Sequence, residues 1–389
     1  MSKKLRPELE ALHARLANTS DEVRADAAAK RHAKGYRTAR ENLADLIDEG
    51  SFTEYGQLAV AAQRNRRDYE DLQQSTAADG VITGTATING KRAAVVVYDY
   101  TVLAGTQGYF HHKKLDRIFE LAEDRQLPVV MYTEGGGGRP GDTDVTTQIA
   151  GLNIRSFSTW AKLSGLVPRI AVNNGYCFAG NAALFGCADI TVATRSSWIG
   201  MAGPAMIEGG GLGTHPPTAI GPIDVQENNG VVDVVAEDEK DATRIAKQLL
   251  GYFQGAIGEW SCPDQSPLRD AMPEDRRWGY PVRSIIETIA DADSFTELRR
   301  KYGRPIVTGF MRLEDNPVGL IASDCQQMGG AIDAEAAEKA ARFLQLCDAF
   351  GLPVVALTDT PGFMVGPESE QQAAVRRMSS LFVTGAGIT

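Results

Sequence analysis

The sequence predicts an α/β fold that is present in two copies. Three observations support this prediction: a long internal repeat, short apolar runs that alternate with helical stretches, and glycine turns after these runs. Residue 83 corresponds to residue 308, and every other repeated position has the same offset of 225. The repeated residues are Thr83-Gly84, Asp99, Gly105, Lys114, Arg117, Leu121, Leu127-Pro128-Val129-Val130, Thr133 and Gly137, which recur as Thr308-Gly309, Asp324, Gly330, Lys339, Arg342, Leu346, Leu352-Pro353-Val354-Val355, Thr358 and Gly362. Identities that keep one register over this length indicate duplication of a folding unit.

Residues 1–50 are predicted to form a helical arm. Leucines recur at helical spacing at the start of the chain, namely Leu5, Leu9, Leu12 and Leu16. Thr38-x-x-Glu41 matches a capping box for a helix that runs through Leu46 to Gly50. The sequence leaves open whether this arm packs on its own domain or on a neighbouring chain.

Beyond Val81 the pattern predicts buried strands that alternate with helices. The strands are expected at 93–98, 128–132, 169–172 and 190–193, and the helices at 109–124 and 146–163. We expect a first domain at 51–252, a linker at 253–290 with a proline-rich stretch, and a second domain at 291–389. The second copy begins near Ser294, because Ser-Phe-Thr-Glu occurs there as it does at Ser51.

Bulk composition excludes several classes of protein. With 389 residues, of which 43% are hydrophobic, the chain is long enough for two globular domains. A net charge of −10 disfavours nucleic acid or an anionic membrane as the main partner. No apolar run approaches the ~18 residues of a membrane span, so we expect a cytoplasmic protein. The five cysteines lack metal-ligand spacing and are interpreted as small core residues without disulfides or zinc.

The most informative local segment is 175–183, Gly-Tyr-Cys-Phe-Ala-Gly-Asn-Ala-Ala, which follows a predicted strand. Small residues that open a helix leave backbone N–H groups unpaired and let a ligand approach them closely. This geometry suits an oxyanion hole, in which each donor contributes roughly 2.7–4 kcal/mol to binding a developing anion. A tight packing turn without a ligand is the alternative.

Two further glycine turns follow predicted strands. They are Leu103-Ala104-Gly105 and the segment 134–141, Glu-Gly-Gly-Gly-Gly-Arg-Pro-Gly. Because the ends of parallel strands meet at one edge of a sheet, the three turns are expected to converge there. None of them ends in Gly-Lys-Ser/Thr or completes a G-x-G-x-x-G pattern, so kinase, ATPase and Rossmann functions are disfavoured.

Side-chain catalysts are not evident. His111 and His112 point about 100° apart on a helix, which favours a solvated face over a joint metal site. Asp142 and Asp144 are interpreted as a solvated loop rather than a cation site. Cys177 is interpreted as a buried structural thiol, since no base accompanies it.

With these features the chain resembles the carboxyltransferase (β) components of biotin-dependent acyl-CoA carboxylases, such as propionyl-CoA carboxylase, in the crotonase-like superfamily. The resemblance covers nearly the whole chain. Its marks are Ala39-Arg40-Glu41, Gly50-Ser51-Phe52, Asp79-Gly80-Val81, Gly137-Gly138-Arg139, Gly203-Pro204, Asn229-Gly230-Val231-Val232-Asp233, Gly329-Gly330-Ala331-Ile332-Asp333, Ala340-Ala341-Arg342-Phe343 and Asp359-Thr360-Pro361-Gly362-Phe363.

The resemblance implies two crotonase-like (ββα superhelix) domains and transfer of CO₂ from carboxybiotin to the α-carbon of an acyl-CoA. It implies that Ala179 and Gly180 stabilise the thioester enolate, with biotin itself as the base. It further implies acyl-CoA contacts at Ala104, Gly105, Gly137, Gly138, Arg139, Gly203 and Pro204. Asn181 stands where the family has a small residue, so we expect it to narrow or re-polarise the pocket.

The same resemblance implies partners and leaves rivals open. Biotin would be carried on a separate domain or subunit, alongside a biotin carboxylase, and the chain would assemble as a dimer to hexamer without metal. At the repeat offset the second-copy counterpart of Gly180 falls beyond Thr389, so the second domain is expected to be truncated before its biotin-side turn. A biotin-dependent decarboxylase subunit and a non-catalytic assembly subunit remain alternatives.

Overall fold

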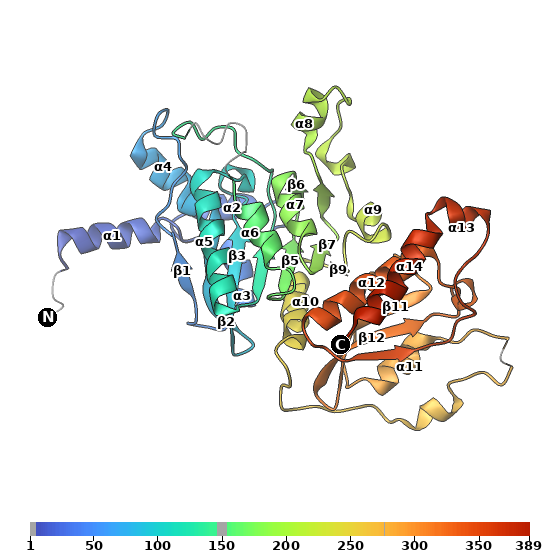
Figure 1. Ribbon diagram of the computed structural model, residues 1–389. Helices are drawn as coiled ribbons and strands as arrows, with labels where there is room; N and C mark the ends of the chain where they lie inside the picture. Colours follow the sequence, from blue (N-terminus) through green and yellow to red (C-terminus); the bar gives the residue numbers. More distant parts are fainter. Residues whose placement is uncertain (1–4, 146–153, 276) are drawn as a thin grey trace. The chain divides into compact units, whose positions relative to one another are not determined.

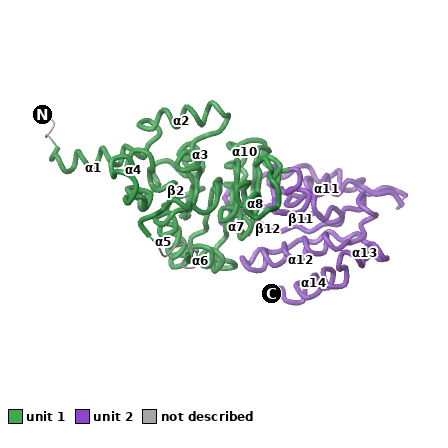
Figure 2. The backbone as a smooth tube through the Cα atoms, turned by 90° about the horizontal axis from the view of Figure 1, so that it is seen from above, with its two compact units in different colours: residues 1–223, 235–247 green, residues 224–234, 248–389 purple. Residues whose placement is uncertain are grey.

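The computed structural model describes residues 5–145, 154–275 and 277–389 (Figure 1). The chain divides into two compact units: residues 1–223 with 235–247, and residues 224–234 with 248–389 (Figure 2). Each unit holds one copy of the repeat. The functional domain limits inferred from the sequence stay a prediction.

Unit 1 is built on a seven-stranded sheet in the order β1-β2-β3-β4-β5-β7-β9. Its strands are β1 (Thr53–Tyr55), β2 (Val81–Ile88), β3 (Lys91–Tyr98), β4 (Val129–Tyr132), β5 (Arg169–Asn173), β7 (Ile190–Thr194) and β9 (Val234–Ala236). β1, β2 and β3 pair antiparallel, whereas β3, β4, β5 and β7 run parallel. The parallel strands carry continuous apolar runs, as expected between two helical layers. All four strands predicted from the sequence are therefore confirmed.

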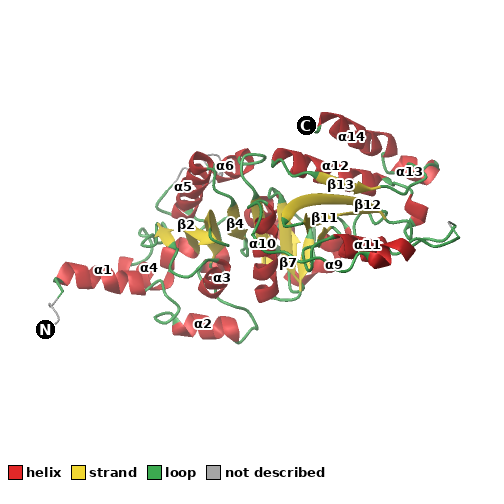
Figure 3. Cartoon of the chain, turned by 90° about the horizontal axis from the view of Figure 1, so that it is seen from below, coloured by secondary structure: helices red, strands yellow, loops and turns green. Residues whose placement is uncertain are grey.

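Helices cover both faces of this sheet. Figure 3 shows α5 (Tyr109–Arg125) and α6 (Ser156–Lys162) on one side and α3 (Ala39–Leu46) on the other. Of the helix predicted at 146–163, residues 146–153 lie outside the described residues, and the described part forms α6. A separate two-stranded layer pairs β6 (Tyr176–Phe178) with β8 (Trp198–Gly200) in parallel.

Unit 2 contains a four-stranded sheet in the order β10-β11-β12-β13. β2, β3 and β4 recur 225 residues later, with identical limits, as β11 (Ile306–Leu313), β12 (Asn316–Ser323) and β13 (Val354–Leu357). Helix α5 recurs as α12 (Ala334–Ala349). The duplicated α/β fold is thus confirmed.

The repeat also extends upstream with a different offset. Helix α3 and β1 recur 243 residues later as α11 (Val282–Ile289) and β10 (Thr296–Leu298). The offset changes because copy 1 has a longer connection between its first two strands, which includes α4 (Tyr69–Ser75). The predicted linker 253–290 therefore includes α11, whose apolar side chains are buried in the core of unit 2.

The predicted N-terminal arm is helical, and its second and third helices pack on its own unit, whereas its limits as a domain stay a prediction. It consists of α1 (Pro7–Ala17), α2 (Ala25–His32) and α3. Thr38 and Glu41 form the predicted capping box, but α3 ends at Leu46, four residues before Gly50. Arg24 anchors α2 to the sheet by pairing with Asp99 at 2.6 Å.

The remaining described helices are α7 (Gly180–Gly186), α8 (Pro204–Gly209), α9 (Ile223–Asn228), α10 (Glu239–Tyr252), α13 (Pro367–Gln371) and α14 (Ala374–Gly387). Among the described residues, none of the helices combines the length and apolarity needed to cross a bilayer.

Candidate functional site

The three predicted turns meet at the carboxyl ends of β3, β4 and β5. The glycine loop is joined to both of its neighbours by backbone hydrogen bonds. Gly136 N–H donates to Ala104 O at 3.0 Å, and Gly135 N–H donates to Tyr176 O at 2.8 Å. The predicted convergence of these turns is therefore what the structure shows.

Only some of the peptide groups in these turns are available to a ligand. Ala179 N–H donates to Gly200 O at 3.0 Å, and Gly105 N–H donates to Val102 O at 3.0 Å. Within the described residues, the N–H groups of Gly180 and Ala104 have no hydrogen-bond partner. Gly180 is the first residue of α7, so its N–H also lies at the positive end of that helix.

Close packing holds the Gly180 turn in an unusual conformation. Ala179 has φ 53° and ψ −120° immediately before α7. A Cβ atom on Gly137 would lie 2.7 Å from the Ala179 Cβ, and one on Gly180 would lie 2.3 Å from Gln107 Oε1. Gly138 faces open space. The glycines are thus required where the loops touch, and Gly138 leaves room for a ligand.

Arg139 lies beneath the glycine loop, with its guanidinium buried. It forms ion pairs with Asp79 and, at 3.5 Å, with Asp142, and it donates to Thr106 O at 2.7 Å. Asp142 in turn accepts from the N–H of Tyr109, at the start of α5. Arg139 therefore ties the glycine loop to the Ala104 turn. The solvated-loop interpretation of Asp142 is wrong, because its side chain is buried by this network.

Gly203 and Pro204 begin α8 and lie beside the β6–β8 layer. A Cβ atom on Gly203 would meet the ring of Phe178 at 3.5 Å. Phe178 directly precedes Ala179. The start of α8 therefore lies next to the Gly180 turn, with the Phe178 ring between them. Gly203 and Pro204 therefore lie near the turn, and neither has a polar side chain.

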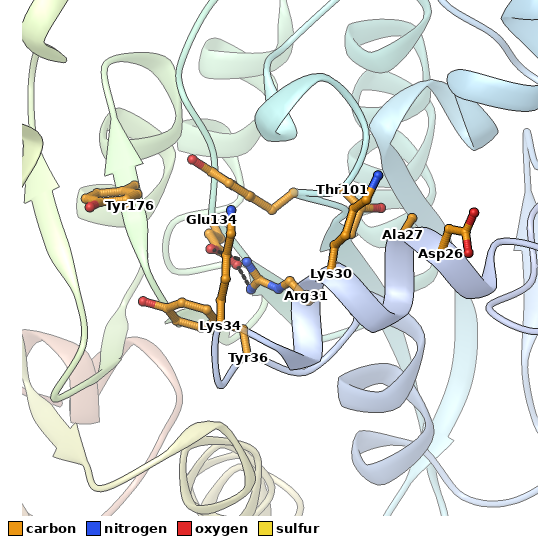
Figure 4. A pocket seen from close by; sticks show the side chains of 10 residues that line it. Asp26, Ala27, Lys30, Arg31, Lys34, Tyr36, Thr101, Glu134 and Tyr176 are labelled. Carbon is orange, nitrogen blue, oxygen red and sulfur yellow. Dashed lines mark hydrogen bonds and ion pairs between the residues drawn. The ribbon is translucent and has the colours of Figure 1, made fainter.

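A cavity of about 460 Å³ opens beside these loops, between α2 and the strand ends (Figure 4). Its lining residues are Asp26, Ala27, Lys30, Arg31, Lys34, Tyr36, Tyr100, Thr101, Glu134 and Tyr176. Lys30 and Lys34 project from successive turns of the arm, and the rings of Tyr36 and Tyr176 face the same space (Figure 4). The cavity thus combines basic and aromatic groups.

Glu134 and Arg31 form a buried ion pair in the wall of this cavity. Burial raises the pKa of Glu134 to about 7, although the neighbouring guanidinium favours the carboxylate. Sequence reasoning did not single out either residue. The signal was present, because the repeat places an acid, Asp359, at the position equivalent to Glu134.

A cavity of about 490 Å³ occupies the equivalent place in unit 2. Its lining residues are Met272, Pro273, Arg277, Trp278, Gly279, Tyr280, Cys325, Gly329, Thr358 and Asp359. By the repeat offsets, Gly329 corresponds to Ala104 and Asp359 to Glu134. Within the described residues the Gly329 N–H also has no partner. The duplication therefore includes the ligand-sized cavity as well as the strands.

Several sequence interpretations of side chains need correction. His111 and His112 are buried rather than on a solvated face, because α5 packs this side onto α6 and the turn before β2. Cys177 is buried as expected, but Cys187 and Cys262 are exposed. Among the described residues, no group of three potential metal ligands occurs.

A model of the family described as carboxyl transferase domain matches residues 30–384. The chain belongs to the carboxyl transferase domain family. One relative is the propionyl-CoA carboxylase beta chain of Saccharopolyspora erythraea, 32% identical over 93% of this chain and 69% of the relative. Another is the biotin-dependent acetyl-/propionyl-coenzyme A carboxylase beta5 subunit of Mycobacterium tuberculosis, 30% identical over 95% of this chain and 70% of the relative.

A solved single-chain, multi-domain long-chain acyl-CoA carboxylase shares the fold of this carboxyl transferase chain. The TM-score is 0.96 with 55% identity, and the match covers 99% of this chain but 39% of that protein. The chain therefore spans less than half the length of the multi-domain carboxylase. The expected crotonase-like fold and the enzyme family are both confirmed.

Proposed function

We propose that this carboxyl transferase chain moves CO₂ between carboxybiotin and the α-carbon of an acyl-CoA, through a thioester enolate. The main support is a pair of N–H groups, on Gly180 and Ala104, that have no partner in the described part of the chain and lie in loops beside a basic and aromatic cavity. Two such donors match the needs of a thioester oxygen that becomes negatively charged.

In this proposal the turns have distinct tasks. Gly180 and Ala104 donate to the thioester oxygen, and Ala179 shapes the turn because its own N–H is already used. Gly105 and Gly137 allow the loops to touch, and Gly138 gives the ligand room. Arg139 holds the loops together from below rather than contacting CoA. Gly203 and Pro204 would border the acyl group.

We assign the nucleotide part of CoA to the cavity in Figure 4. Lys30 in α2 and Lys34, just beyond the end of α2, project into this cavity, where their ammonium groups suit the diphosphate. Tyr36, Tyr100 and Tyr176 offer ring faces for adenine or apolar contact for pantetheine. This arrangement would also explain how a protein of net charge −10 binds a polyanion.

The equivalent cavity of unit 2 fits a biotin ring. Carboxybiotin, carried on a separate domain or subunit with a biotin carboxylase, would supply the CO₂. Asp359 would accept from a ureido N–H, the Gly329 N–H would donate to its carbonyl oxygen, and the exposed Trp278 and Met272 would give apolar contact. Assembly as a dimer to hexamer stays a prediction.

The test is carboxyl transfer by the natural holoenzyme, given ATP, labelled bicarbonate and a panel of acyl-CoA esters. We expect label in an acid-stable carboxyacyl-CoA, and loss of this label when Lys30 and Lys34 are both replaced by glutamate. A holoenzyme that transfers label only from separately supplied, carboxyl-labelled carboxyacyl-CoA to biotin would favour the decarboxylase alternative. Absence of transfer in either direction by a folded holoenzyme would favour the assembly-subunit alternative.

A further inference from the structure

Asn181 follows Gly180 in α7, and its side chain is completely buried. Its Oδ1 accepts from the Gly137 N–H at 3.0 Å. Its Nδ2 donates to Thr133 O at 3.0 Å and to Gly105 O at 3.4 Å. One amide group therefore joins the end of β4, the glycine loop and the Ala104 turn to the start of α7.

The packing around this amide leaves little freedom for the loops to slide. A Cβ atom on Gly135 would lie 2.3 Å from Asn181 Nδ2 and 2.3 Å from Gly105 O. The amide thus occupies the space in which the glycine loop and the Ala104 turn approach each other. Its side chain is fully engaged there, so the expectation that it narrows or re-polarises the ligand pocket is replaced by a different role.

We propose that Asn181 is a positioning residue that fixes the two backbone donors, Gly180 N–H and Ala104 N–H, relative to each other. Asn181 does not contact the substrate. It is attached directly to one donor residue and, through Gly105 O, it holds the residue next to the other. The inference rests on the proposed function, because it assumes that these two donors bind the thioester oxygen.

A role in packing alone would not require this side chain. Asn181 instead satisfies polar groups on separate loops, which sets their relative positions as well as their burial. Small displacements of catalytic groups cost up to about 10²-fold in rate, so a group that prevents them has a measurable effect.

The experiment measures the carbonyl stretch of a ¹³C-labelled acyl-CoA thioester bound to the chain, by difference infrared spectroscopy. Two donors are expected to move this band to lower frequency than in free acyl-CoA. Asn181→Ala should lose about half of the shift or more, with the acyl-CoA dissociation constant changed less than about threefold. In the holoenzyme the same change should lower kcat by ~10- to 100-fold with little change in KM.

Three other variants complete the test. Asn181→Asp keeps the acceptor for Gly137 but loses both donors, so it should also lose the shift. Asn181→Ser replaces Asn181→Ala if that variant does not fold. Asn42→Ala is the matched control, because Asn42 is a buried asparagine on α3 that bonds Glu239 and none of the three loops. It should leave the band in place.

The outcomes separate the two proposals. If the unmodified chain binds no acyl-CoA, or binds it without moving the band, the proposed function fails first. If the band shifts in the unmodified chain and shifts equally in Asn181→Ala or Asn181→Ser, Asn181 has no positioning role. A loss of binding that parallels a loss of thermal stability in these variants would likewise overturn the inference, because it indicates general destabilisation.

Discussion

At the level of single residues, the proposed roles depend on which backbone N–H groups already have a hydrogen-bond partner within the fold. Of the four N–H groups in the two turns, those of Ala179 and Gly105 are bonded within the fold, whereas those of Gly180 and Ala104 have no partner among the residues that the structure describes. The turns could be predicted from the sequence, because runs of small residues directly after strands favour tight turns. The sequence did not predict which N–H groups remain free, because Gly200 O is about twenty residues from Ala179 and becomes its acceptor only after β8 folds.

Gly180 is a residue at which a single methyl group is expected to matter. Gly180→Ala places a Cβ atom 2.3 Å from Gln107 Oε1. Gln107 is buried and donates to the Tyr98 hydroxyl at 2.9 Å, so it does not move freely. We expect a loss of roughly 1–3 kcal/mol in the free energy of unfolding, together with slower carboxyl transfer.

Urea unfolding and holoenzyme rates test this prediction. Combining Gly180→Ala with Gln107→Ala should recover part of both losses, because the second change removes the colliding oxygen. Equal stability of Gly180→Ala and the unmodified protein would show that the turn has room for a methyl group beside Gln107.

The two buried histidines predict a pH dependence of stability. Burial lowers the pKa of His112 from 6.5 to about 4, and it lowers the pKa of His111 well below 6.5. Between these values the unfolded chain binds protons that the folded chain does not, so stability falls as pH decreases from about 6.5 to 4. For His112 the full effect is roughly 3 kcal/mol.

The measurement is the free energy of unfolding between pH 4 and 7. His112→Asn keeps a nitrogen for Ser156 and should flatten the slope, whereas replacing the exposed His215 should not. An unchanged slope in His112→Asn would mean that other groups control the acid response.

At the scale of elements, the repeat explains the placement of two buried lysines. Lys114 in α5 donates to the carbonyl oxygens of Ala78 and Val81, before and at the start of β2. Lys339 in α12 donates to Arg299, Tyr302 and Ile306 O, before and at the start of β11. In each copy a helix thus uses an ammonium group to hold the segment that leads into the second strand.

Removing this ammonium group should be costly in either copy. Lys339→Met leaves three backbone acceptors without their donor, and we expect a loss of roughly 2–5 kcal/mol in the free energy of unfolding. Lys301→Met provides the control, because its exposed pair with Glu227 contributes at most ~1 kcal/mol. Chemical denaturation of both variants is the measurement, and equal stabilities would show that the Lys339 ammonium group does not hold this segment.

Sequence reasoning recovered most elements but not the arm's contribution to the site. Apolar runs and periodicity are local signals, so the sequence predicted the limits of several elements within a few residues. These elements are the strands β3, β4, β5 and β7 and the helix α5. The sequence did not predict that α2 and the residues after it line a cavity, because Lys30 and Lys34 resemble an ordinary solvated face. Long-range pairs bring that face to the strand ends, namely Arg31 with Glu134, 103 residues apart, and Arg24 with Asp99.

At the scale of the whole molecule, the two copies of the fold carry two related cavities. The two cavities share the strand-end position and an acidic residue, Glu134 or Asp359, but they differ in their outer walls. The wall of unit 1 is basic and suits a polyanion. The wall of unit 2 carries tryptophan and methionine, which suit a small uncharged ring. One ancestral fold could thus come to bind two different partners of a transfer reaction.

This difference predicts a salt dependence for one ligand only. Acyl-CoA binding should weaken as salt increases, and Lys30→Ala with Lys34→Ala should lower affinity about tenfold and reduce this dependence, because exposed ammonium groups contribute through screened charge. Calorimetric titration at several salt concentrations is the measurement. Salt-independent affinity in the unmodified chain would place the diphosphate elsewhere.

The two proposed backbone donors are tested most directly by a structure of the chain with an acyl-CoA analogue whose thioester is replaced by a stable ester or amide. We expect the acyl oxygen about 2.7–3.1 Å from both Gly180 N and Ala104 N, with the diphosphate beside Lys30 and Lys34. An acyl oxygen that contacts neither N–H group, or an analogue bound outside unit 1, would contradict this expectation.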